Sequence, residues 1–151
     1  CKKECFNTAI ETCFYGPWGH LEALLPYINT IYADLKLVDR ERHKKYCGVD
    51  NELIMNNLLA ADRAEGRFRL VIRTPVIPGI NDSEEELTRI GQFCAGLKRL
   101  AHIQLLPYHK LGTATYKKLG RPYLLEGVET PSPEHMERCR EIVRQYVKNT
   151  I

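Results

Sequence analysis

Four short apolar segments, separated by segments of helical pattern, dominate this chain. They cover residues 6–12, 31–37, 68–74 and 101–106. Their nearly continuous apolar character is typical of strands that are covered on both faces of a parallel sheet. The alternation of such strands with helices predicts right-handed strand–helix–strand crossovers. We therefore expect an α/β fold built on a four-stranded parallel sheet.

The segments between and after the strands carry helix signals. Helices are expected from about residue 18 to 27, and from Asp50 as N-cap to about residue 64, before Gly66. A third begins at Asp82-Ser83, where three following glutamates predict a capping box and an acidic first turn. The last begins at Ser132-Pro133. Two apolar stripes with spacings of three and four mark the buried faces: Leu87, Ile90, Cys94 and Leu97, then Met136, Cys139, Val143 and Tyr146.

Composition limits the classes of function. Hydrophobic residues make up 44% of the 151 residues, enough for a core. The net charge of +3 arises from 22 basic and 19 acidic residues that are interspersed, which argues against a nucleic-acid partner. No apolar run reaches the roughly 18–20 residues of a membrane span, and no signal peptide is evident. We expect residues 1–151 to form a single domain in the cytoplasm, with no membrane partner.

Several common site motifs are missing from the chain. It has no glycine-rich phosphate loop, no tandem CxxC pairs and no HExxH, and no serine or cysteine nucleophile with its base is evident. The six cysteines are scattered through apolar and helical stretches, so we expect reduced thiols rather than disulfides. We therefore expect no metal site and no catalytic residue within this chain.

Ionisable or polar side chains stand at or just after the end of each expected strand. Parallel strands place ligand chemistry at their carboxyl ends, so these side chains should share one rim. Taken singly, each has an ordinary explanation: an Asp–Lys pair, an arginine on a surface carboxylate, a loop histidine. Taken together they indicate a site for a zwitterionic or multiply polar ligand, because unpaired charge on the inner face of a sheet is costly. The candidates are Glu11, Thr12, Asp34, Lys36, Arg73 and His109.

Three segments in one frame resemble a known family. They are Tyr32-Ala33-Asp34-Leu35-Lys36, then residues 72–79 (IRTPVIPG), then residues 105–112 (LLPYHKLG). In this order and spacing they closely resemble the pyruvate formate-lyase activating enzymes, which are glycyl radical enzyme activating enzymes of the radical SAM superfamily. The likeness runs from about Phe6 to the C-terminus.

The resemblance implies a fold and a position within it. The family has a partial (β/α)6, TIM-like barrel, and these four strands match its third to sixth. The family's CxxxCxxC loop, which binds a [4Fe–4S] cluster, and its Gly-Gly-Glu segment have no match here. Cys1 and Cys5 mimic the start of the cluster motif, but Thr8 occupies the third ligand position. We therefore expect the C-terminal portion of a radical SAM barrel without the N-terminal cluster-binding part.

The resemblance also implies roles for the candidate residues. Asp34, Lys36 and His109 match positions that contact S-adenosylmethionine. Arg73 matches an arginine that engages the glycine-bearing loop of the partner enzyme. Glu11 and Thr12 stand where the family usually has Asp-Thr, close to the carboxylate of the cofactor. Two departures are Glu11 in place of aspartate and Phe14 where a glycine usually follows.

The activity implied for the full-length protein is that of a radical SAM oxidoreductase in anaerobic metabolism. It cleaves S-adenosylmethionine reductively, with an electron from flavodoxin or ferredoxin, and removes a hydrogen atom from a glycine Cα of a glycyl radical enzyme. Without the cluster this chain should be inactive, with weak S-adenosylmethionine affinity. One alternative is a module that docks on a glycyl radical enzyme without catalysis. Another is a half-barrel that binds an unrelated metabolite. An open sheet should also self-associate through its bare edge.

Overall fold

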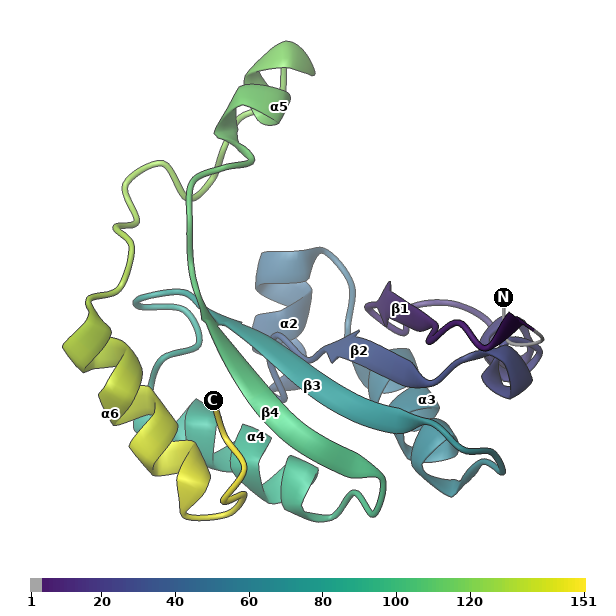
Figure 1. Cartoon of the computed structure of the whole chain (residues 1–151). Helices are drawn as coiled ribbons and strands as arrows, with labels where there is room; N and C mark the ends of the chain where they lie inside the picture. Colours follow the sequence, from purple (N-terminus) through teal and green to yellow (C-terminus); the bar gives the residue numbers. More distant parts are fainter. Residues whose placement is uncertain (1–3) are drawn as a thin grey trace.

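The computed structural model describes residues 4–151 and contains one parallel sheet in the order β1-β2-β3-β4 (Figure 1). Strand order follows chain order, so each crossover leads to the adjacent strand. This is the strand order of a barrel wall. In a doubly wound sheet, by contrast, the strand order reverses at a point within the sheet. The predicted α/β fold with a four-stranded parallel sheet is confirmed. The strands are β1 (Ala9–Thr12), β2 (Thr30–Asp34), β3 (Arg69–Val76) and β4 (Leu100–Pro107).

Helices α3, α4 and α6 lie along one face of the sheet, and α5 stands away from the body on a long connection after β4 (Figure 1). No helix of residues 4–151 is long and apolar enough to cross a membrane. The helices are α1 (Trp18–Glu22), a 3-10 turn (Leu25–Tyr27), α2 (Arg40–Cys47), α3 (Glu52–Arg63), α4 (Glu84–Ala95), α5 (Thr113–Lys118) and α6 (Pro133–Arg144).

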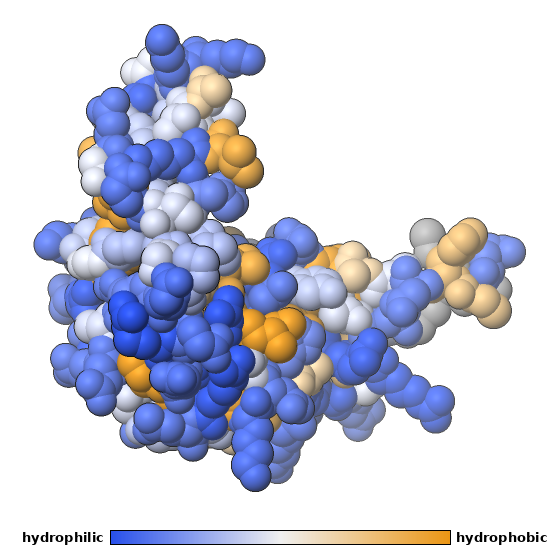
Figure 2. Space-filling model, turned by 60° about the vertical axis from the view of Figure 1, so that its left-hand side comes forward, coloured by the Kyte–Doolittle hydropathy of each residue, from blue (hydrophilic) through white to orange (hydrophobic). Residues whose placement is uncertain are grey.

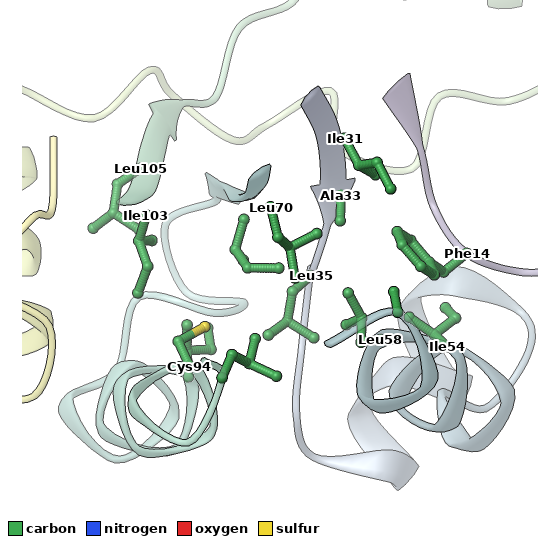
Figure 3. Close-up of a cluster of buried hydrophobic side chains, with 14 of the residues drawn as sticks. Phe14, Ile31, Ala33, Leu35, Ile54, Leu58, Leu70, Cys94, Ile103 and Leu105 are labelled. Carbon is green, nitrogen blue, oxygen red and sulfur yellow. The ribbon is translucent and has the colours of Figure 1, made fainter. Parts of the chain in front are cut away.

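The core fills the space between the sheet and these helices. Ala33, Ile72 and Ile103 occupy one register level of β2, β3 and β4 and are fully buried. Leu58 of α3 and Cys94 of α4 lie beneath them (Figure 3). Since successive side chains of a strand point to opposite faces, the residues between these core positions point to the other face. Three of the candidate residues, Glu11, Asp34 and Arg73, occupy such positions.

The sequence predicted most helix faces correctly. Every member of the two expected apolar stripes is buried except Tyr146, which is exposed beyond the end of α6. Tyr146 instead packs against α4, where a Cβ at Gly91 would lie 2.7 Å from its ring. The glycine therefore permits close approach of the two elements.

Several boundaries differ from the prediction. The strand expected from residue 6 begins at Ala9, and the helix expected over 18–27 breaks after Glu22 into the proline-containing 3-10 turn. The second strand ends at Asp34, so Lys36 lies beyond it. The N-cap of α3 is Asn51, while the Asp50 carboxylate accepts from the N–H of Glu52 at 3.1 Å.

The predicted capping box at α4 is half formed. The Ser83 hydroxyl accepts from the N–H of Glu86 at 3.3 Å, as the motif requires. The Glu86 carboxylate does not return to Ser83 but reaches the turn after β2. A tertiary contact therefore replaces the local one.

One edge of the sheet is paired with another segment and the other edge is not. The C-terminal tail extends the sheet beside β4, where the N–H of Ile103 donates to Asn149 O at 3.0 Å and that of Leu105 donates to Ile151 O at 2.8 Å. Among residues 4–151, no strand pairs with the outer edge of β1. The bare edge is therefore at β1.

The turn after β1 depends on a buried aromatic residue in a left-handed conformation. Phe14 has φ of 58° and its side chain is 3% exposed. The left-handed region is one that glycine adopts without steric cost. The turn therefore keeps a glycine-like backbone although the sequence has Phe14 where the family resemblance has glycine.

The substitutions Phe14→Ala and Phe14→Gly should separate packing from strain at this turn. Both remove a buried ring, which should cost about 3–5 kcal/mol of unfolding free energy. Phe14→Gly should recover about 1 kcal/mol relative to Phe14→Ala, because alanine keeps the left-handed strain. Urea denaturation of the two variants measures the difference. Equal stability, or a more stable alanine variant, would contradict a strained turn.

The bare β1 edge should cause self-association, because unpaired strand groups are templates for pairing. The substitution Ala9→Lys adds a charge to this exposed strand position and should shift the chain toward monomer. Size-exclusion chromatography with light scattering, over a range of concentrations, measures the shift. Ala95→Lys, an equal change at the end of α4, is the control. A wild-type chain that stays monomeric throughout would refute the prediction.

Candidate active site

Three charged side chains from three adjacent strands meet on the face of the sheet opposite the core. Asp34 of β2 and Arg73 of β3 are register partners, and Glu11 of β1 pairs in register with Tyr32. In β2 and β3 they alternate with buried residues such as Ala33 and Ile72. The arrangement therefore follows from strand alternation and parallel register.

The Arg73 guanidinium is held by both carboxylates. Its two terminal nitrogens donate to Glu11 at 2.8 and 3.0 Å, as a bidentate pair. Nε and one terminal nitrogen donate to Asp34 Oδ1 at 3.3 and 3.2 Å. The guanidinium carbon lies 5.4 Å from the centroid of the Tyr32 ring. These contacts use four of the five N–H donors of arginine.

Exposure differs strongly across this cluster. The Arg73 side chain is 17% exposed, that of Asp34 29% and that of Glu11 67%. The hydrogen bond and charge of Arg73 lower the pKa of Glu11, and the hydrogen bond to Glu11 contributes most to a raised pKa of Arg73. Because Glu11 faces solvent, its ion pair is screened and exchangeable. We infer that Arg73 and Asp34 form the fixed part and Glu11 the replaceable part.

The remaining candidates lie apart from this cluster. The Thr12 hydroxyl accepts from the N–H of Phe14 at 3.0 Å, and alternation directs it to the face opposite Glu11. His109 is exposed at the start of the connection to α5. Within the described part of the chain, no ion pair or hydrogen bond joins Lys36 or His109 to the Arg73 cluster, and Lys36 does not pair with Asp34 through its side chain.

Lys36 lines a cavity of about 440 Å³ at the carboxyl end of the sheet. Tyr46 and Cys47 of α2 form part of its wall, and Tyr116 and Tyr123 from the segment around α5 form another part. Burial raises the pKa of the Cys47 thiol, while the charge of Lys36 acts in the opposite direction. The cavity is thus lined by aromatic and aliphatic side chains, with two cations, Lys36 and Lys45.

The turn that carries Lys36 is fixed by buried polar side chains from other elements. The Thr74 hydroxyl donates to Leu35 O at 2.7 Å. Asn81 Nδ2 donates to Lys36 O at 2.8 Å and to Pro75 O at 2.7 Å. Asn51 Nδ2 donates to the carbonyls of residues 37 and 38, at 3.0 and 2.8 Å. These side chains are almost completely buried, so the turn has little freedom to move.

A third buried asparagine fixes the turn after β1. Asn57 Nδ2 donates to Phe14 O and Gly16 O, each at 2.8 Å. Sequence reasoning missed all three asparagines, together with Thr74, Glu86 and Tyr32. A polar residue inside an otherwise apolar helical stripe, such as Asn57 beside Ile54 and Leu58, is the available signal.

Metal binding is a separate question. Cys1 lies outside the described residues, so the geometry of the Cys1-x-x-x-Cys5 segment is not defined, and Cys5 is exposed. Within residues 4–151, no three His, Cys, Asp or Glu side chains come together as a metal site requires. The expectation that cluster ligands belong to another part of the protein stays a prediction.

Sequence comparison identifies the relatives of this chain. No family model matches it. The indoleacetate decarboxylase activating enzyme of Tractidigestivibacter scatoligenes is 37% identical over 147 residues, covering 97% of this chain and 46% of that protein. The pyruvate formate-lyase 1-activating enzyme of Escherichia coli is 33% identical over 150 residues, which cover 97% of this chain and 59% of that protein. The chain is homologous to the glycyl radical enzyme activating enzymes. It spans about half the length of these relatives.

Solved structures agree with this relationship. A crystallised domain of a pyruvate-formate lyase-activating enzyme from Bacteroides vulgatus covers the whole chain with a TM-score of 0.79 and 27% identity, over 83% of that domain chain. A radical SAM methyltransferase from Sphaerobacter thermophilus has a TM-score of 0.63 at 16% identity, over 98% of this chain and 41% of its own. The second match shows a shared fold alone. The recognition of the family from its three sequence segments is confirmed.

The substitution Arg73→Gln should raise the pKa of Glu11 toward its ordinary value of 4.5, because the partner that lowers it is removed. A carboxylate with a lowered pKa stabilises the fold above its ordinary pKa, and this contribution is lost as the pH falls through the lowered value. As the pH falls below 4.5, the free energy of unfolding of the wild-type chain should therefore decrease more than that of the variant. Carboxyl carbon NMR titration measures the pKa. Glu137, whose pKa is lowered by Arg144 and Arg140, is the internal control. An unchanged Glu11 titration would show that the ion pair does not form in solution.

Proposed function

We propose that this chain is the C-terminal portion of the radical SAM barrel of a glycyl radical enzyme activating enzyme, and that it supplies part of the S-adenosylmethionine site and the contact to the partner. The meeting of Glu11, Asp34 and Arg73 at one face of the sheet carries this proposal. The relatives named above are activating enzymes, which supports the class of reaction.

The donor set fits S-adenosylmethionine, which presents an ammonium, a carboxylate, a ribose diol and a sulfonium. The carboxylate of Asp34 would accept from the ammonium or a hydroxyl group, and Glu11 would do so after releasing Arg73. Lys36 would donate to the carboxylate of the cofactor. The cavity that Lys36 lines has room and aromatic walls for the adenine ring. His109, on the connection after β4, would reach the cofactor as a planar donor or acceptor. Thr12 would contribute indirectly, because its hydroxyl accepts from the N–H of Phe14 and so holds the turn after β1.

The bound cofactor supplies a 5′-deoxyadenosyl radical when an electron arrives from a [4Fe–4S] cluster. The role of this chain is positional. Arg73 would donate to a carbonyl of the glycine-bearing loop of the partner, with donors that Glu11 now occupies. The cluster, the electron donor of flavodoxin or ferredoxin type, and the cytoplasmic, anaerobic setting belong to the full-length protein. This chain alone is proposed to be inactive.

The names of the relatives limit the partner to a class. One relative activates an indoleacetate decarboxylase and another a pyruvate formate-lyase. These two relatives act on different enzymes, so the family resemblance gives the class of the partner and not its identity. We propose a glycyl radical enzyme as the partner of this chain, without a choice among them.

Calorimetric titration with S-adenosylmethionine tests the cofactor role. The chain should bind weakly, with a dissociation constant no higher than the millimolar range, and Asp34→Asn and Lys36→Gln should each weaken binding about tenfold, equal to about 1.4 kcal/mol. Glu65→Gln and Lys98→Gln make matched charge changes at exposed positions in the connections before β3 and β4 and should not alter binding. No binding at millimolar ligand would refute the role.

A further inference from the structure

A buried carboxylate lies beneath the turn that follows Asp34. Glu86, in the first turn of α4, has 0% exposure. One of its oxygens accepts from the N–H of Val38, and the N–H of Asp39 lies 3.4 Å from the same atom. Its charge is therefore directed at the backbone between β2 and α2, away from its own helix.

This placement is costly. The second carboxylate oxygen, Oε2, is buried and accepts no hydrogen bond, and Arg89 Nη1 lies 3.7 Å from it. A buried carboxylate oxygen that accepts no hydrogen bond costs free energy that an apolar side chain would not, and the ion pair with Arg89 offsets this cost in part. Helix capping does not require this residue, because Ser83 caps α4 alone. The interaction with the turn is what Glu86 provides.

The turn is fixed from two sides. Asn81, Asn51 and Thr74 hold its carbonyl groups, while Glu86 holds its N–H groups. A backbone whose donors and acceptors are both bound to buried side chains keeps one conformation. Asp34 ends β2 immediately before this turn and Lys36 stands in it. The strand fixes the direction of Asp34, and the conformation of the turn sets that of Lys36 relative to it.

Glu86 also joins the two segments on which the proposed site depends. It belongs to the helix that follows the loop after Arg73, and it binds the turn that follows Asp34. Arg42 adds a second link between these segments, from α2 to Ile80 O. The spacing between the Asp34–Lys36 segment and the loop after Arg73 is therefore set by the buried Glu86 together with Arg42 and the ion pair of Arg89 with Asp39.

We propose that Glu86 is a positioning residue of the S-adenosylmethionine site, which holds the β2–α2 turn so that Lys36 faces the same ligand as Asp34. This proposal rests on the proposed function for the identity of the ligand. The structural arrangement of the turn stands independently of it.

The experiment compares Glu86→Ala with Glu86→Gln in the chain as it stands. Glu86→Ala leaves the N–H groups of Val38 and Asp39 without an acceptor, so their hydrogen exchange should accelerate at least tenfold. The amides of Leu70 and Ile72 in the centre of the sheet should exchange at the wild-type rate. Glu86→Gln keeps one acceptor oxygen and should restore most of the protection.

Calorimetry on the same variants gives the functional readout. S-adenosylmethionine should bind about tenfold more weakly to Glu86→Ala and close to normally to Glu86→Gln. Glu84→Ala is the matched control, because Glu84 is exposed in the same first turn of α4 and its side chain makes no ion pair or hydrogen bond with the described residues. It should change neither exchange nor binding.

Three outcomes would overturn the proposal. Exchange that accelerates equally in the sheet and the turn would make Glu86 a general stabilising residue. Turn amides that stay protected in Glu86→Ala would show that Glu86 does not hold the turn. Binding to Glu86→Ala equal to that of Glu84→Ala would show that the turn does not position the ligand. A wild-type chain that binds no S-adenosylmethionine would refute the proposed function, and hydrogen exchange would then decide the role of Glu86 in the turn.

Discussion

The carboxyl end of this sheet depends on the satisfaction of backbone polar groups by buried side chains. In the turns after β1 and β2, buried asparagine side chains donate to backbone carbonyl groups. The Asn57 side chain donates to carbonyl groups of the first turn, and those of Asn51 and Asn81 donate to carbonyl groups of the second. Leaving one such buried group unpaired costs on the order of 1–3 kcal/mol. Loss of any one amide would therefore move the backbone that carries the candidate site.

The charged cluster follows from a second constraint. Arg73 lies on the central part of the sheet and is mostly withdrawn from solvent, so its guanidinium requires carboxylate partners. Asp34 reaches it from the adjacent strand. Glu11 reaches it from β1, two strands or about 9–10 Å away, which favours a side chain longer than aspartate. The glutamate that departs from the family pattern thus has a physical role: it completes the bidentate pair.

The sequence predicted the sheet, its parallel direction and the residues at the strand ends, because apolar strands and strand-end charges are local patterns. It did not predict α2, whose segment Arg40–Cys47 has no apolar stripe, or α5, which stands apart from the core. Figure 2 shows a largely hydrophilic segment rising above the body, with isolated apolar residues. Such segments lack the periodicity on which helix prediction depends.

The buried polar contacts were equally invisible in the sequence. In the sequence, Glu86 matches the last position of a capping motif. In the fold, its carboxylate instead accepts from the N–H of Val38, which is 48 positions earlier. Likewise the sequence placed Lys36 at a strand end with Asp34, whereas the strand stops at Asp34 and Lys36 borders a separate cavity. Long-range contacts between loops decide both cases, and no local pattern encodes them.

Chemical-shift mapping of S-adenosylmethionine on the isotope-labelled chain tests the account most directly. The account predicts that the backbone signals of residues 34–37 and of Arg73 shift on titration. Those of Asp62 and Arg99, which pair at the opposite end of the strands, should remain unchanged. Shifts confined to other surfaces, or no shifts at millimolar cofactor, would contradict the central claim that this edge of the sheet is part of the cofactor site.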